Sequence, residues 1–359
     1  MKKNKFYIRL LMIAVWILLF GMFISLPYLS SLWQSQKAIN LLTWANTIDP
    51  KVIDAFEQET GIKVNTTYFD SNEELFVKFY TSKGEGYDLI MPSDYLMEKL
   101  IHFNLLKPID KSRLDFWDRL LPRLLNHYFD PENTYSVPYY WAIYGIGVNK
   151  AFFKERLPLS WSLLFSYPIS NAKVGMVNIA REAILISALY LFNSIDQLNQ
   201  EKIEEIKKLL LNQKKRVEAY IDADVRSNYM LISQASPVVI AASPYIAKAI
   251  QSNNNLDFLV PDKGSFILID NLAISARCEQ TELVYKLINF LYRPENIRYH
   301  IENQPFIGTT KELLSIMKEE QFPASIINAH FDETKPLFFF KNIISEDIAN
   351  NIWISLKVS

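Results

Sequence analysis

Short apolar strands alternate with amphipathic helices near the start of the folded part of the chain, and this alternation most constrains the fold. Ile39–Trp44 is predicted as a strand. Asp49 and Pro50 then supply an N-cap followed by proline at the first helical position, and Gly61 is placed to end that helix. The next predicted elements are strand Ile62–Phe69, helix Asn72–Ser82, strand Tyr87–Met91 and a helix after Pro92-Ser93. This β-α-β-α-β succession predicts a parallel sheet with helices on its faces.

Later segments continue the same pattern. Helices are predicted over Ala180–Phe192, Lys202–Leu211 and Glu282–Tyr292, and a buried strand over Pro237–Ala242. A chain of 359 residues is long enough for two lobes of ordinary domain size. Because no Gly/Ser-rich linker is present, we expect strand-like crossings between the lobes, an arrangement that suits a hinge closing over a ligand.

The composition is that of a globular chain, with 50% hydrophobic and 21% charged residues. A net charge of −1 offers no electrostatic footprint for nucleic acid, so no nucleic-acid partner is expected. Cys278 is the single cysteine, which excludes an intramolecular disulfide framework.

The N-terminus carries basic residues followed by an uncharged, largely apolar stretch from Leu10 to Gln36. A stretch of this kind is typical of a cleaved signal peptide or of an uncleaved membrane anchor. We assign residues 1–37 to one of these two alternatives, and in both the rest of the chain faces outward, because positive charges stay in the cytoplasm.

No catalytic or metal-binding pattern stands out. The 4 histidines are scattered without metal-site spacing, and Cys278 has no histidine neighbour in sequence that would activate its thiol. Gly145–Asn149 holds two glycines but not the third that a phosphate-binding loop needs. We therefore expect no enzyme, no cofactor and no metal.

Several stretches, taken in order along the chain, resemble one family, the periplasmic spermidine/putrescine-binding proteins of ABC importers. They are FEQETGIKV (Phe56–Val64), YDLIMPSDY (Tyr87–Tyr95), FDPENTYSVPYYWAIYGIGVN (Phe129–Asn149), NIARE (Asn178–Glu182), DNLAIS (Asp270–Ser275) and LINFLYRPENI (Leu287–Ile297). The resemblance covers nearly the whole chain after residue 38. It is specific for solute-binding proteins and less so for the polyamine branch.

The resemblance implies an α/β, two-lobed type II periplasmic-binding-protein fold after the N-terminal anchor or signal helix. Lobe one would comprise residues 38–141 and 270–312, and lobe two residues 142–269 and 313–359. A polyamine, putrescine or spermidine, would bind between the lobes of a monomer in the periplasm. The monomer, either free or tethered to the inner membrane by an uncleaved N-terminal helix, would deliver it to an ABC permease there.

The resemblance also implies aromatic candidates for the ligand site. A polyamine needs carboxylates for its ammonium groups and aromatic faces for its methylenes. Trp44 ends the first strand and would line the cleft, or else cap the core. Ser93 would contact ligand or only cap a helix, and Tyr95 would form a cage wall. Asn46 is a further candidate for ligand binding in this part of the chain.

The acidic candidates are Glu182 and Asp270. Glu182 lies in the first turn of a predicted helix, where it would bind ligand or only stabilise the helix start. Asp270 interrupts two apolar runs, so its buried charge needs a partner. That partner would be a ligand ammonium or a group at the hinge crossing.

The chain departs from the family pattern at four positions. Ile179 stands where the family has a cleft aspartate, Ile240 and Leu268 stand where it has tryptophans, and Gln304 replaces a tyrosine. Tyr140, Trp141 and Tyr144 would refill the space or pack the hinge. The departures leave two alternative functions open. The chain would be a binding protein for a less charged solute, or a membrane-anchored interaction protein with a degenerate cleft.

Overall fold

The computed structural model describes residues 12, 15–16, 38–45, 47–169 and 172–358. The signal or anchor segment predicted over 1–37 therefore lies almost entirely outside the described residues, as does Asn46. Across the part of the chain that is described, no helix combines the length and apolar character that crossing a membrane requires.

The described chain alternates strands and helices throughout. The strands are β1 (Ala38–Trp44), β2 (Lys63–Phe69), β3 (Leu89–Ile90), β4 (Val137–Asn149), β5 (Val174–Val177), β6 (Val217–Ile221), β7 (Val238–Ala242), β8 (Leu256–Leu259), β9 (Ser265–Ile274) and β10 (Leu337–Phe339). The α-helices are α2 (Pro50–Thr60), α3 (Asn72–Thr81), α4 (Asp94–His102), α5 (Ser162–Phe165), α6 (Ala180–Phe192), α7 (Gln200–Gln213), α8 (Val225–Ile232), α9 (Ser243–Ser252), α10 (Thr281–Leu291), α11 (Pro294–Asn303), α12 (Leu313–Glu319), α13 (Ala324–Phe331) and α14 (Glu346–Val358).

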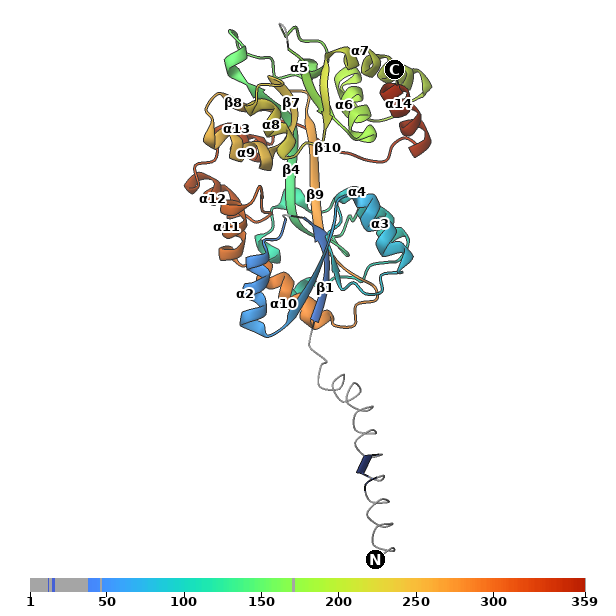
Figure 1. Ribbon diagram of the computed structural model, residues 1–359, viewed down its shortest axis with the longest axis vertical. Helices are drawn as coiled ribbons and strands as arrows, with labels where there is room; N and C mark the ends of the chain where they lie inside the picture. The colour runs from blue at the N-terminus through green and yellow to red at the C-terminus, as the bar shows by residue number, and fades with distance from the viewer. Residues whose placement is uncertain (1–11, 13–14, 17–37, 46, 170–171, 359) are drawn as a thin grey trace, which may run out of the picture.

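These elements form two lobes that follow one another along the long axis of the molecule (Figure 1). One lobe contains β1 with α2, α3, α4 and α10, and the other contains α5 to α9 with α13 and α14. The strand order is β2-β1-β3-β9-β4-β7-β5-β6. The long strands β4 and β9 pair antiparallel at its centre and run from one lobe into the other. The lobes are thus connected by continuous strands, as the α/β two-lobed prediction requires.

The sheet of the first lobe is built as the sequence predicts. β1 pairs in parallel with both β2 and β3, while β9 enters antiparallel beside β3. The proposed lobe boundaries after residues 141 and 269 fall inside the crossing strands β4 and β9. The predicted strand over Tyr87–Met91 is shorter in the structure, at Leu89–Ile90.

Local capping chemistry explains why α2 begins and ends where it does. Asp49 accepts a hydrogen bond from the Lys51 N–H, and Pro50 occupies the first helical position. Gly61 then adopts a left-handed conformation with φ 69° and returns its N–H to the Glu57 carbonyl. Burial of Phe56 fixes the face that packs on the core. The predicted helix Ala180–Phe192 has the same bounds in the structure.

The glycines of the Gly145–Asn149 stretch serve packing. Gly145 lies within β4, where a Cβ would come 2.5 Å from Phe258 Cζ and 2.8 Å from the Leu259 carbonyl oxygen. Crowding of this kind costs about 1–3 kcal/mol. We therefore expect Gly145→Ala to lower the free energy of unfolding by about 2 kcal/mol, as measured by urea denaturation. Gly308→Ala is the control, because its nearest neighbour is a side-chain methyl of Ile297 at 3.1 Å. An equal loss in both variants would contradict this interpretation.

Candidate functional site

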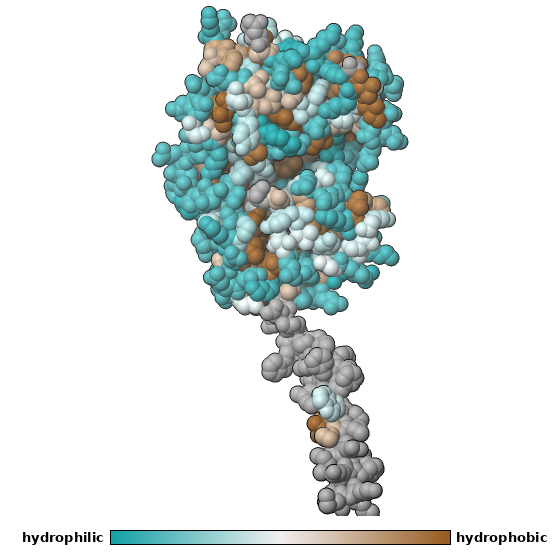
Figure 2. All heavy atoms as spheres, viewed as in Figure 1, coloured by the Kyte–Doolittle hydropathy of each residue, from teal (hydrophilic) through white to brown (hydrophobic). Residues whose placement is uncertain are grey.

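A cleft of about 980 Å³ lies between the two lobes, with walls drawn from both. On the face shown in Figure 2, the surface is hollowed at the level where the lobes meet. Strand ends and helix N-termini of each lobe converge there, as expected for ligand sites in open α/β sheets. The volume is that of an ordinary small-molecule site.

The sequence-predicted site residues within the described chain all line this single cleft. They come from segments that are far apart in sequence and are Trp44, Ser93, Tyr95, Glu182 and Asp270. This convergence supports the hypothesis of one shared site, which dispersal of these residues over unrelated surfaces would have contradicted. That they bind a ligand remains a prediction.

Asp270 is held by a short chain of buried polar side chains. The Ser93 hydroxyl donates to Asp270 Oδ1 at 2.5 Å, and Asn72 Nδ2 donates to Ser93 Oγ at 3.0 Å. Asn72 Oδ1 also accepts the Ser93 N–H at 3.1 Å. Ser93 occupies the N-cap position of α4, but its side chain makes no capping bond. The serine hydroxyl is therefore committed to orienting Asp270.

The Asp270 carboxylate is 5% exposed and forms no ion pair among the described residues. Burial raises the pKa of Asp270 to about 7, with a contribution from nearby Asp94, while the Ser93 hydrogen bond acts in the opposite direction. Asp94 is itself buried and accepts the Ile269 N–H at 2.8 Å. A buried carboxylate without a counterion favours the approach of a cation.

Glu182 forms the second acidic point of the cleft. It lies in the first turn of α6, where the helix dipole favours a negative charge. The carboxylate is 4% exposed, and the Tyr144 hydroxyl donates to its Oε1 at 3.3 Å. Its Oε2 has no hydrogen-bond partner among the described residues. Burial raises the pKa of Glu182 to about 8, although nearby Arg181 acts to lower it.

Aromatic side chains supply the walls between these carboxylates. Trp44 packs against Phe69 with ring centroids 4.5 Å apart. The buried Trp44 Nε1 has no partner within the described chain. Tyr140 and Tyr144 line the cleft as well, whereas Trp141 is fully buried outside the lining and donates its Nε1–H to the Gly308 carbonyl at 2.8 Å. Trp141 therefore packs the crossing region rather than refilling the cleft.

Arg181 places a fixed cation inside the cleft. Its guanidinium carbon lies 3.7 Å from the centroid of the Tyr95 ring, so a cation–π contact joins the two lobes. One terminal nitrogen donates to Asn342 Oδ1 at 3.1 Å, while the buried Nε lacks a partner among the described residues. One face of Tyr95 is therefore already covered by the protein itself.

The four departures from the family pattern divide into two pairs. Ile179 and Leu268 line the cleft, and Ile179 is 39% exposed there. Ile240 is instead fully buried in β7, outside the lining, where Ala242 further along the strand reaches the cleft. The Gln304 amide donates to Asp49 Oδ2 at 2.9 Å and so supports the N-cap of α2. Neither Ile240 nor Gln304 therefore forms part of the cleft lining.

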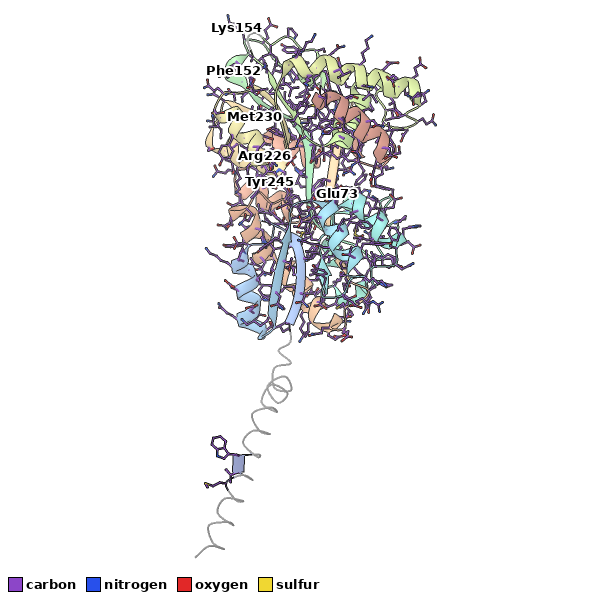
Figure 3. The ribbon with its side chains drawn as sticks, turned by 45° about the vertical axis from the view of Figure 1, so that its right-hand side comes forward. Glu73, Phe152, Lys154, Arg226, Met230 and Tyr245 are labelled. Carbon is purple, nitrogen blue, oxygen red and sulfur yellow. The ribbon has the colours of Figure 1, made fainter. Side chains whose placement is uncertain are left out.

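Several cleft residues were missed from sequence. Figure 3 shows Glu73 on the first lobe and Arg226 and Tyr245 on the second, all at the level of the cleft. Arg226 forms ion pairs with both Asp222 and Asp224, at 2.7 Å for Asp224. Asp222 and Asp224 directly after β6 are a sequence signal for their own place in the cleft, since strand ends face the cleft, whereas Glu73, Arg226 and Tyr245 give no such signal.

A nucleophilic or metal site is not assembled in the described chain. The Ser243 hydroxyl lies 2.8 Å from His330 Nε2, but both residues are fully buried outside the cleft lining. Burial raises the pKa of the Cys278 thiol to about 11, which disfavours a reactive thiolate. No group of three or more possible metal ligands occurs among the described residues.

Two α/β lobes, continuous strand crossings and a cleft bearing buried carboxylates define the class of two-lobed solute-binding proteins. The chain belongs to the bacterial extracellular solute-binding protein family, whose model matches residues 51–324. This family binds solutes, so the chain is a binding protein and not an enzyme.

Its relatives agree with the resemblance seen in the sequence. The chain is 34% identical to the spermidine/putrescine-binding periplasmic protein of Salmonella typhimurium, over 70% of this chain and 72% of that one. It is 28% identical to the putrescine-binding periplasmic protein PotF of Escherichia coli, over 77% of this chain and 79% of that one. A solved spermidine/putrescine ABC transporter substrate-binding protein from Streptococcus pneumoniae has the same fold, with a TM-score of 0.74, 24% identity and coverage of 90% and 99%.

Proposed function

We propose that this protein captures a polyamine of the putrescine/spermidine class in its cleft and delivers it to an ABC permease of the inner membrane. The relatives named above support this class of ligand. The proposal assigns the body of the chain to the periplasm, as a monomer whose N-terminal segment is a cleaved signal or a tether. Lobe one would be 38–141 with 270–312, and lobe two 142–269 with 313–359.

The observation that carries the proposal is the pairing of Asp270 and Glu182. Both carboxylates are at least 95% buried, both line one cleft and neither has an ion-pair partner in the described chain. Leaving such charges without a counterion costs several kcal/mol each, roughly, after relaxation. A ligand with ammonium groups removes this cost, and Trp44 and Tyr140 then lie in the cleft wall beside its methylene chain.

Calorimetric titration of the purified protein with putrescine and spermidine tests the proposal. We expect saturable binding of at least one amine, with one site per chain. Flat traces with both amines at pH 8.5, where most of both carboxyl groups is ionised, would refute polyamine capture. Mass determination of the mature N-terminus then distinguishes a cleaved signal from a tether.

A less charged solute is the second candidate, and two observations favour it. Ile179 and Leu268 give the cleft an apolar wall, and Trp44 Nε1 and Arg181 Nε are buried donors without partners in the described chain. A ligand with one ammonium and one acceptor oxygen would satisfy these groups. A thermal-shift panel separates the candidates, because the true ligand raises the melting temperature by mass action.

A further inference from the structure

Most acidic side chains of the cleft already have a cation or are solvated. Asp222 and Asp224 both pair with Arg226. Glu346 at the start of α14 pairs with Lys99 of α4 at 3.0 Å. Asp222 and Asp224 share the single charge of Arg226, and all three carboxylates are at least 30% exposed, so they offer less to an incoming ammonium group than a buried, unpaired carboxylate does.

Two further acidic residues, Asp70 and Glu73, line the cleft but are exposed to solvent. An ion pair at such a position contributes only about 0–1 kcal/mol, because water screens it. Among the acidic residues that line the cleft, Asp270 and Glu182 are therefore the two that are buried and have no ion pair in the described chain. The cleft thus has two strong acceptor points for cations.

The rest of the wall disfavours a third ammonium. Arg181 already lies over the Tyr95 ring at 3.7 Å, so that aromatic face holds a cation of the protein. Ile179 and Leu268 present apolar surface in the lining. An ammonium placed against them would lose water without gaining a charge partner, and that loss is costly.

We propose that the cleft selects a linear diamine over a triamine, with one ammonium at Asp270 and the other at Glu182. Ile179 contributes to this selectivity because its apolar side chain offers no charge partner to a third ammonium group. The inference rests on the proposed function and adds to it the number of ammonium groups that the ligand carries. It concerns specificity, so it can fail while polyamine capture stands.

Titrations with putrescine, spermidine and n-butylamine at pH 8.5 test the charge count. We expect putrescine to bind at least about tenfold more tightly than either of the others, which corresponds to about 1.4 kcal/mol. Spermidine binding as tightly as putrescine would overturn the selectivity alone. Butylamine matching putrescine would show that only one carboxylate is used and would also overturn it. Absence of binding by all three amines would instead defeat the proposed function.

Ile179 offers a matched pair of variants. It is the N-cap residue of α6 and makes no side-chain capping bond. Aspartate and asparagine cap a helix about equally well, so Ile179→Asp and Ile179→Asn differ chiefly in charge. We expect Ile179→Asp to raise the affinity for spermidine about tenfold over Ile179→Asn, with a smaller change for putrescine. Equal spermidine affinities in the two variants would overturn the role given to Ile179.

Discussion

Asp270→Asn is expected to weaken putrescine binding by at least about 100-fold, or about 2.7 kcal/mol. Asparagine retains the shape of the side chain and an oxygen that accepts the Ser93 hydroxyl, so the main change is the loss of charge. Removing one member of a buried, hydrogen-bonded charge pair costs about 2–5 kcal/mol. Calorimetry at pH 8.5 measures the effect directly.

Two comparisons make this result specific. Ser93→Ala should weaken binding only about three- to tenfold, because it leaves the Asp270 charge in place and removes its orienting hydrogen bond. Asp262→Asn should leave binding unchanged. Asp262 is exposed, forms an ion pair with Lys335 at 3.3 Å and does not belong to the cleft lining. Equal affinities in the Asp270→Asn and Ser93→Ala variants would contradict the ranking.

The affinity for putrescine should rise by at least about tenfold between pH 6 and pH 8.5. Burial raises the pKa of Asp270 to about 7 and that of Glu182 to about 8, so both groups are largely protonated at pH 6. A bound ammonium favours the ionised carboxylates, so binding near neutral pH releases protons. The groups near Glu182 include Arg181, which partly offsets its raised pKa, and Asp222 and Glu73, which add to it.

Calorimetry in buffers with different ionisation enthalpies measures the released protons directly. In Glu182→Gln the pH dependence should become shallower, because one of the two titrating groups is gone. An affinity that stays constant from pH 6 to pH 8.5 would show that these carboxyl groups do not titrate in the free protein.

The raised pKa values of Asp270 and Glu182 make folding stability fall with rising pH, whereas they make ligand affinity rise. A carboxyl group whose pKa is raised by folding stabilises the folded state while it is protonated. That stability is present below the unfolded pKa near 4 and is lost as the pH rises towards about 8. The ligand-free cleft therefore destabilises the protein at the pH where it binds best.

The fold could be read from the sequence because its signals are local. Asp49, Pro50 and Gly61 determine the ends of α2 through bonds to residues within one turn. The run from Ala180 to Phe192 contains no glycine or proline and is largely apolar after Glu182, so its helix has the predicted bounds. Tertiary pairing decides strand length, and this is why β3 is shorter than predicted.

The site was only partly predictable, because its walls depend on contacts across the chain. Asp270 stood out as a charge between apolar runs. Arg226 gave no such signal, since its function in the cleft depends on Asp222 and Asp224 next to it at the end of β6. Ile240 and Ala242 share one strand, and only their depth along that strand decides which one reaches the cleft.

The position of Asp270 on β9, one of the two strands that connect the lobes, has a kinetic consequence. Its carboxylate is held by Ser93 of the first lobe, whereas Glu182 belongs to α6 of the second lobe. We therefore expect an arriving cation to meet Asp270 in an open cleft, and to meet Glu182 only when the lobes close. Asp270 should therefore govern the rate of capture, and Glu182 the dwell time of the trapped molecule.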